Sequence, residues 1–273
     1  MRILILFWVA VLFGGCKTSK KTASDEPLIK YDINMNTGIV EYDALRRLYM
    51  VTPKEAVYMY SESNKLSFKY SNSKKGKIEA LDVSNPLKVV VFYKSKQYAI
   101  VLDNTLSVLA QIDLSAIGLE NITATAAAPE DQYWVFSSKS HQLIKIDAFG
   151  KILSESKSMA ELGMSEENIV KITTSEDAVI LTDPKQGFFI FDENGMFKKH
   201  FKAGDIRTTQ FDGRNVFYYT PTGLKTFNLI FYDKINISIP PVSNLNTIRC
   251  VLYSDEDFLE VYPLGIIRKA KSK

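Results

Sequence analysis

The sequence predicts an all-β fold, a β-propeller of six four-stranded blades, from three observations. Beyond residue 38 the chain is a succession of short segments rich in Val, Ile, Tyr, Phe and Thr, separated by turns of Gly, Asn, Asp, Ser and Lys. Such segments are typical of β-strands. They recur in groups of four, with a period of roughly 37 to 47 residues. Four strands in a repeat of about 40 to 50 residues are the signature of a propeller blade. The first strands of the groups begin near Ile39, Lys77, Ile122, Ile169, Ile206 and Thr247.

The individual strands follow from alternation of apolar and polar residues in the four central groups. The second group predicts strands over 77–83, 87–93, 98–103 and 106–114, and the third over 122–128, 133–138, 143–147 and 151–156. The fourth group predicts strands over 169–174, 178–183, 188–192 and 196–201, and the fifth over 206–211, 215–220, 223–227 and 232–238. In the pairs Tyr133–Trp134 and Tyr218–Tyr219, the alternation predicts that one residue of each pair faces outward.

Three aspartates mark the same turn in successive groups. Asp103, Asp147 and Asp192 each end a third strand and precede a tight turn into the fourth. An aspartate at this position caps a hairpin turn with its side chain. We therefore interpret the three residues as a marker of the repeat and not as a catalytic set.

The two ends of the chain predict how the ring closes. The last group, TIRCVLY, FLEVY and GIIRKAK, lacks a fourth strand, and an unassigned strand-like segment, LIKYDIN, precedes the first group. If the N-terminal segment completes the last blade, the ring is latched and its sheet edges are protected. Residues 28–273 then form one domain. A β-sandwich or a solenoid of the same strands is the alternative, although neither requires a period.

The first residues, MRILILFWVAVLFGGC, are typical of an export signal with a lipid attachment site. The apolar run from Ile3 to Phe13 is shorter than the roughly 20 residues that span a bilayer, and it fits a secretory signal. Small residues before Cys16 resemble the lipobox of bacterial lipoproteins, although Phe13 stands where Leu is usual. We therefore expect a signal peptide over 1–15 and a lipid on Cys16. An ordinary signal peptide or an uncleaved anchor, with Cys16 incidental, is the alternative.

The segment after Cys16 predicts a disordered tether over residues 16–27. Its sequence, KTSKKTASDEP, is polar and has no large apolar side chain, so it cannot contribute to a core. Stable anchoring takes two or more hydrophobic signals, which a multiply acylated Cys16 would supply. We expect the bacterial cell envelope, most simply its outer membrane, as the location.

Composition argues against nucleic-acid binding and against a disulfide in the fold. The net charge of +3 is spread along the chain, so no basic face for nucleic acid is apparent. Cys16 and Cys250 are the only cysteines. A lipid on the first therefore leaves the fold without a disulfide. Cys250 is interpreted as a buried core thiol.

The predicted inner strands argue against hydrolytic chemistry in the central channel. Apart from Glu79 and Asp82 they are poor in acids, whereas hard cations need several converging oxygen ligands. They carry threonines together with Lys171, Arg207 and Arg249, which could bind an anion or simply line a wet channel. The two histidines, His141 and His200, lie in predicted turn or edge positions. We expect no catalytic residue, no metal and no cofactor.

The repeat region resembles the six-bladed β-propeller repeat families. Residues 76–156, with LDVSNPLKVVVFYKSKQYAIVLD and YWVFSSKSHQLIKID, are similar to a group of uncharacterised secreted or lipid-anchored propeller proteins of Bacteroidota. That resemblance implies no activity. The layout of lipobox and propeller is also similar to the propeller lipoproteins of the outer-membrane β-barrel assembly machinery, which act as scaffolds and have more blades. No diagnostic motif ties the chain to them.

Two functional hypotheses follow from the sequence. The first is a non-enzymatic, lipid-anchored propeller that binds another protein of the cell envelope. The longer connections, SAIGLEN and SMAELGMSEEN, could serve in binding or could be length variation, and the second could form a helical turn. The competing hypothesis is an enzyme or small-ligand binder that acts through the central channel.

Overall fold

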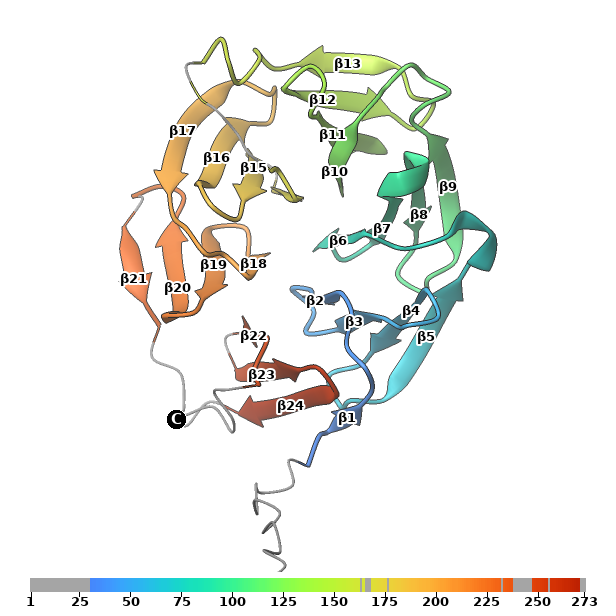
Figure 1. The fold of residues 1–273 in the computed structure, drawn as a ribbon, viewed down its shortest axis with the longest axis vertical. Coiled ribbons are helices and arrows are strands. Elements are labelled where there is room, and N and C mark those ends of the chain that lie inside the picture. Colours follow the sequence, from blue (N-terminus) through green and yellow to red (C-terminus); the bar gives the residue numbers. More distant parts are fainter. Residues whose placement is uncertain are drawn as a thin grey trace, which may run out of the picture.

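The computed structural model is a closed ring of β-sheets, and it describes residues 30–162, 164, 168–175, 177–231, 233–237, 247–254 and 256–270 (Figure 1). Within these residues the chain forms six four-stranded antiparallel sheets. Five of the sheets are made of four consecutive strands, as short hairpin connections favour. The predicted six-bladed propeller is therefore confirmed, and the sandwich and solenoid alternatives are wrong.

We number the blades in chain order. Blade 1 contains β2 (Val40–Tyr42), β3 (Leu48–Val51), β4 (Ala56–Tyr60) and β5 (Leu66–Ser71). Blade 2 contains β6 (Ala80–Asn85), β7 (Lys88–Tyr93), β8 (Tyr98–Leu102) and β9 (Val108–Asp113). Blade 3 contains β10 (Ile122–Ala127), β11 (Gln132–Ser137), β12 (Gln142–Asp147) and β13 (Ile152–Glu155). Blade 4 contains β14 (Lys171–Thr174), β15 (Ala178–Asp183), β16 (Gly187–Asp192) and β17 (Phe197–Lys202).

The remaining two blades close the ring. Blade 5 contains β18 (Thr208–Phe211), β19 (Asn215–Thr220), β20 (Gly223–Asn228) and β21 (Lys234–Asn236). Blade 6 contains β22 (Cys250–Tyr253), β23 (Asp257–Tyr262), β24 (Gly265–Ala270) and, as its outer strand, β1 (Ile33–Asn34). Short 3-10 helices lie at Ser73–Lys75 and Lys94–Lys96.

The N-terminal strand latches the ring, as the sequence predicts. Ile33 pairs with Ile266 in the antiparallel register of β1 and β24, and the two strands lie side by side in Figure 1. The amide of Asp32 donates to the carbonyl of Ile266 at 2.9 Å, and its carboxylate accepts from the amide of Arg268 at 2.7 Å. Gly265 makes this close approach possible, because a Cβ there would lie 2.5 Å from the carbonyl oxygen of Ile33.

Apolar side chains fill each junction between neighbouring blades. Among the described residues there are six buried clusters, one for each junction, and that between blades 6 and 1 includes Ile33, Leu48 and Leu259. Each sheet therefore packs on both faces. For this reason the outward placement predicted within the pairs Tyr133–Trp134 and Tyr218–Tyr219 is wrong. All four side chains are buried, because a second strand has a neighbouring blade on each side.

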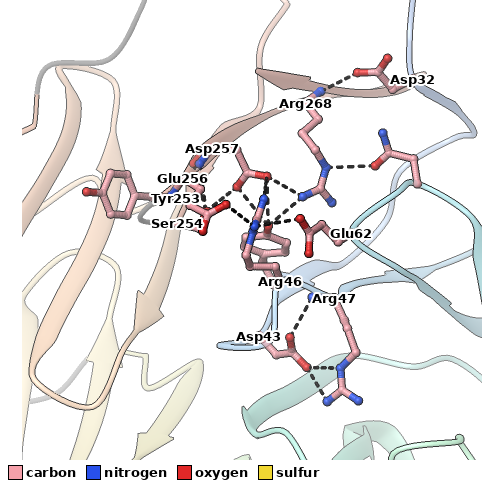
Figure 2. A network of polar contacts seen from close by, with 12 residues as sticks. Asp32, Asp43, Arg46, Arg47, Glu62, Tyr253, Ser254, Glu256, Asp257 and Arg268 are labelled. Atoms are coloured by element: carbon pink, nitrogen blue, oxygen red, sulfur yellow. Dashed lines mark hydrogen bonds and ion pairs between the residues drawn. The ribbon is translucent and has the colours of Figure 1, made fainter. Parts of the chain in front are cut away.

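A polar network reinforces the junction between blades 6 and 1 (Figure 2). The buried carboxylate of Asp257 accepts from Nη1 of Arg268 at 2.6 Å, from Nη2 of Arg46 at 3.2 Å and from the hydroxyl of Tyr42 at 3.1 Å. The hydroxyl of Ser254 also donates to it. Burial alone would raise the pKa of Asp257, but hydrogen bonds from Ser254 and Arg268 and the nearby guanidinium charges lower it below its usual value.

The same network extends to blade 2. The carboxylate of Asp43 accepts from Nε of Arg47 at 2.7 Å and from the hydroxyl of Tyr49 at 3.1 Å. Nη2 of Arg47 then donates to the carbonyl of Pro86 at 2.5 Å. Three consecutive blades are thus joined by polar contacts at the junction where the chain begins and ends.

The predicted turn aspartates are confirmed. In each case one carboxylate oxygen accepts two backbone hydrogen bonds within the turn. Oδ1 of Asp103 accepts from Thr105 and Ser107, and Oδ1 of Asp147 accepts from Phe149 and Lys151. Asp192 accepts in the same way from Asn194 and Met196. These aspartates hold hairpins together.

Candidate functional site

The central channel contains a cavity of about 660 Å³. Its lining comes from the inner strands of blades 1, 2, 4, 5 and 6 and from the connections that lead into them. This volume lies within the range of about 300 to 1,000 Å³ that is typical of small-ligand pockets. The structure places Glu79, Lys171, Arg207 and Arg249, which the sequence analysis singled out, around this one cavity.

An ion pair across the ring closes the floor of the cavity. Nζ of Lys171, on blade 4, lies 2.6 Å from Oε2 of Glu41, on blade 1, and also donates to the carbonyl of Thr209 at 3.0 Å. Burial raises the pKa of Glu41, and the attraction of Lys171 lowers it in part. Both residues also line a second, much smaller cavity, so the pair separates the two.

Asp82 belongs to the smaller cavity. Its carboxylate accepts from the amide of Ala127 at 2.9 Å and from the amide of Ser84 at 3.0 Å. Burial raises the pKa of Asp82, and these two hydrogen bonds oppose the rise. The side chain thus joins blades 2 and 3 and does not meet Glu79 in the large cavity.

Glu41 is a channel residue that the sequence analysis missed. The strands of the first group were not assigned individually, so the inner strand of blade 1 was not considered. The segment IVEYD, which starts at the predicted onset near Ile39, carried the signal. Within the described ranges, no group of three or more His, Cys, Asp and Glu side chains is placed to hold a metal ion.

Cys250 and the two histidines lie in positions that do not favour reactivity. Cys250 lines the large cavity and packs against two apolar clusters, and burial raises the pKa of its thiol to about 12. Cys250 is half-buried between the apolar clusters and the cavity, so the prediction of a buried core thiol is only partly correct. His200 lies on the outer strand β17, stacked on Phe189 with ring centroids 4.1 Å apart, and His141 lies in an exposed turn.

The proposed signal peptide (1–15), the lipid site Cys16 and the tether (16–27) lie outside the described residues. In the part of the chain that the structure describes, no helix has the length and apolar character needed to cross a membrane. The longer connection that could form a helical turn contains one helix-like hydrogen bond, from the amide of Leu162 to the carbonyl of Ser158 at 3.1 Å. It is described only in part.

The two faces of the ring carry opposite charge. Turns between the first and second and between the third and fourth strands of each blade lie on one face, because the blades are antiparallel meanders. The described residues of these turns include ten acids and five bases, and we call this the acidic face. The acids are Asp43, Glu62, Asp103, Glu130, Asp131, Asp177, Glu193, Asp212, Asp233 and Glu256, and the bases are Arg46, Arg47, Lys65, Lys151 and Arg214.

The opposite face, formed by the turns between second and third strands and the connections between blades, is called the basic face. Its described residues include eleven bases and five acids. The bases are Lys54, Lys74, Lys75, Lys77, Lys94, Lys96, Lys139, Lys157, Lys185, Arg207 and Arg249, and the acids are Glu55, Glu79, Glu120, Glu161 and Asp205. The large cavity opens here, since its lining includes the residues that lead into the inner strands.

Exposed apolar side chains gather on the turns of the acidic face. Phe149 is 92% exposed, Phe231 72% and Ile230 70%. Met196 is exposed in the turn between the third and fourth strands of blade 4, as these three residues are in theirs, and Leu45 and Leu87 are exposed in the turns between the first and second strands of blades 1 and 2. Five consecutive blades thus present large apolar residues on one face. The first described residues, from Lys30, enter the ring from the same face, because β1 runs antiparallel to β24.

Comparison with solved structures supports the fold. The WD40 domain of Neurospora crassa Pan2 is 11% identical, with a TM-score of 0.51 over 88% of this chain and 80% of that one. The C-terminal WD40 domain of Sif2 is 8% identical, with a TM-score of 0.52 over 86% and 70%. BamB from Moraxella catarrhalis is 15% identical over 81% and 66%, but its TM-score of 0.42 is too low to support an argument.

The comparisons do not extend beyond the fold. No family model matches the chain, and no curated protein matches it. Identities of 8% and 11% carry neither residues nor partners from one propeller to another. The chain is an all-β, six-bladed β-propeller.

Proposed function

We propose that the chain is a lipid-anchored docking platform of a bacterial cell envelope, held at the membrane by a lipid on Cys16 and binding a protein partner without catalysis. The observation that carries the docking role is the set of exposed apolar side chains on the acidic face. A single exposed apolar residue needs no explanation, but apolar residues repeated over one face are typical of an interaction surface. Loops on a rigid scaffold are suited to this role.

The chemistry of the acidic face favours a protein over the lipid surface as its occupant. An anionic membrane attracts bases and repels a face on which ten acids stand against five bases. Aromatic and methionine side chains are enriched in the buried parts of protein interfaces. The proposed partner therefore has an apolar contact area with a basic rim, complementary to the acidic face.

The lipid anchor is supported by the sequence around Cys16. The segment FGGC follows an apolar run of the length of a secretory signal, and 13 residues separate Cys16 from Lys30. A chain of that length spans at most about 45 Å when it is extended. Such a tether, which would join the propeller on its acidic face, keeps that face within reach of a partner at the bilayer.

A pair of apolar substitutions tests the docking role. Phe149→Ser with Phe231→Ser removes two exposed rings without changing charge, and neither residue supports the core. In native cells, affinity isolation of this variant should recover at least about tenfold less partner than the unaltered chain, because a few aromatic residues carry most of the energy of an interface. Leu264→Ser is the control, since Leu264 is exposed on the basic face. Unchanged recovery by the double variant would contradict the proposal.

A further inference from the structure

The mouth of the large cavity on the basic face carries two arginines that form no ion pair with any residue the structure describes. Arg207, on the connection into blade 5, is exposed and has no ion pair or side-chain hydrogen bond with another described residue. Arg249, on the connection into blade 6, lies at the edge of the same cavity. Lys171 below them is already paired with Glu41 at 2.6 Å. Among the described residues that line the cavity, the two arginines are therefore the cations without an ion pair.

Arg249 is held in a fixed orientation. Its Nη1 donates to the carbonyl oxygen and, at 3.1 Å, to the hydroxyl of Thr37, in the connection between β1 and β2. This contact uses one nitrogen of the guanidinium and leaves the rest of the group available. A guanidinium held in this way offers its remaining donors in a planar fork that suits a carboxylate.

The wall of the cavity also contains two buried threonines. Thr182 is 2% exposed and Thr209 is 4% exposed, and both residues line the cavity. Their hydroxyl oxygens have almost no accessible surface, so these groups belong to the wall and do not reach into the cavity.

Within the described lining, the acid at the mouth is Glu79, and it forms no ion pair with either arginine. Glu79 comes from blade 2, across the ring from blade 5, and its carboxylate accepts from the amide of Ser95 at 2.6 Å. Arg207, Arg249 and Lys171 all line this one cavity, as does Glu41, which is paired with Lys171. The lysines of the surrounding basic face add attraction at longer range.

From this arrangement we propose that the mouth of the channel is a carboxylate-binding site, in which Arg207 and Arg249 bind the carboxylate. This site goes beyond the proposed docking function, because it lies on the opposite face of the ring. Acidic side chains of a peptide and small free organic acids share the carboxylate chemistry, and the cavity volume admits either.

The test measures binding to the full chain, purified in detergent. The probes are a fluorescent ten-residue peptide of alternating Glu and Gly with an amidated C-terminus, and succinate as its competitor. Arg207→Gln with Arg249→Gln should weaken peptide binding at least about tenfold, because charge-assisted hydrogen bonds are lost. The matched control is Lys54→Gln with Lys157→Gln, which removes the same charge from exposed positions of the basic face outside the cavity. It should weaken binding less than about threefold at physiological salt, where distant charges are screened.

The possible results distinguish small acids from acidic peptide segments as ligands, and both from results that overturn the proposal. Displacement of the peptide by millimolar succinate assigns the site to small acids, whereas binding of the peptide alone assigns it to acidic segments, and both support a carboxylate site. Equal weakening by the two double variants would show diffuse charge and overturn it. So would no binding of either probe, or binding only to phosphatidylglycerol vesicles. Arg207→Gln alone is the second variant, because Arg207 has no described side-chain contact whose loss could unfold the chain.

Discussion

Replacing Asp257 by asparagine is expected to lower the free energy of unfolding by about 3 kcal/mol at neutral pH. Asp257 is buried, and its carboxylate is the shared acceptor of Arg46 and Arg268 at the junction that closes the ring. Asparagine keeps the shape and the hydrogen bond with Tyr42 but leaves two partly buried guanidinium groups without their common counter-charge. Loss of one partner from such a network costs far more than the intact network contributes.

The loss of unfolding free energy caused by this substitution depends on pH, and the pKa shift of Asp257 determines the direction. The folded pKa of Asp257 lies below its usual value, so the unfolded chain takes up the proton first as pH falls. The stabilisation is fully present above the unfolded pKa of about 3.9 and is lost as pH falls through the folded value. Urea unfolding should therefore give a constant difference between the two chains from about pH 5 to pH 8, and a shrinking one below about pH 4.

Glu62→Gln is the control for Asp257. Glu62 pairs with the same Arg46 at 2.9 Å, but its side chain is largely exposed. A surface pair of this kind contributes about 0 to 1 kcal/mol. If both substitutions cost the same, or if the difference for Asp257 does not shrink as pH falls below about 4, the buried carboxylate does not hold the junction together as described.

Replacing Cys16 by serine is expected to move the protein almost entirely from the membrane fraction to the soluble fraction of the cell envelope. The acyl chains are the only strong membrane attachment in the proposal, because each buried CH₂ contributes about 0.8 kcal/mol and the nearby lysines contribute little beside them. Membrane and soluble fractions are separated by ultracentrifugation and the protein is quantified in each.

The second cysteine supplies the control for the anchor. Cys250→Ser changes the only other thiol, which lies in the wall of the channel, and should leave the protein at the membrane. Incorporation of a labelled fatty acid should be lost in the Cys16 variant and retained in the Cys250 variant. A Cys16→Ser chain that remains with the membrane would show that the apolar N-terminal segment, and not a lipid, retains it.

Most of the fold could be predicted from the sequence because each blade repeats the same strand pattern, so several segments give the same evidence. The six predicted onsets lie within three residues of the first residues of β2, β6, β10, β14, β18 and β22. Turn residues such as Asp147 act locally, so their role is visible in a few neighbouring letters. The pairing of the N-terminal strand with the last blade could be predicted because the last group lacked a fourth strand and an unassigned strand-like segment preceded the first group.

The features that escaped prediction arise from contacts between distant parts of the chain. Tyr133 and Trp134 alternate, yet both are buried, because a blade has neighbours on both faces and alternation no longer separates inside from outside. Glu41 meets Lys171 only when blades 1 and 4 lie across the ring. Asp257 and Arg46 are separated by most of the chain.

The opposite charge of the two faces could not be predicted for a related reason. Lysines and acids are mixed evenly along the sequence, so a linear count shows no patch. The antiparallel meander separates them in space. The described turns between first and second and between third and fourth strands carry mainly acids and exposed apolar residues, whereas the turns between second and third strands and the connections between blades carry mainly lysines and two arginines. The contrast in charge between the two faces is therefore a product of topology.

Photo-crosslinking in living cells tests the docking claim most directly. A photoreactive amino acid placed at position 149 or 231 of the membrane-bound chain probes the acidic face, and one at position 264 probes the basic face. Mass spectrometry then identifies whatever is captured. The account predicts that positions 149 and 231 capture the same envelope protein and that position 264 does not. Capture of lipid alone from positions 149 and 231, or equal capture of that protein from position 264, would contradict it.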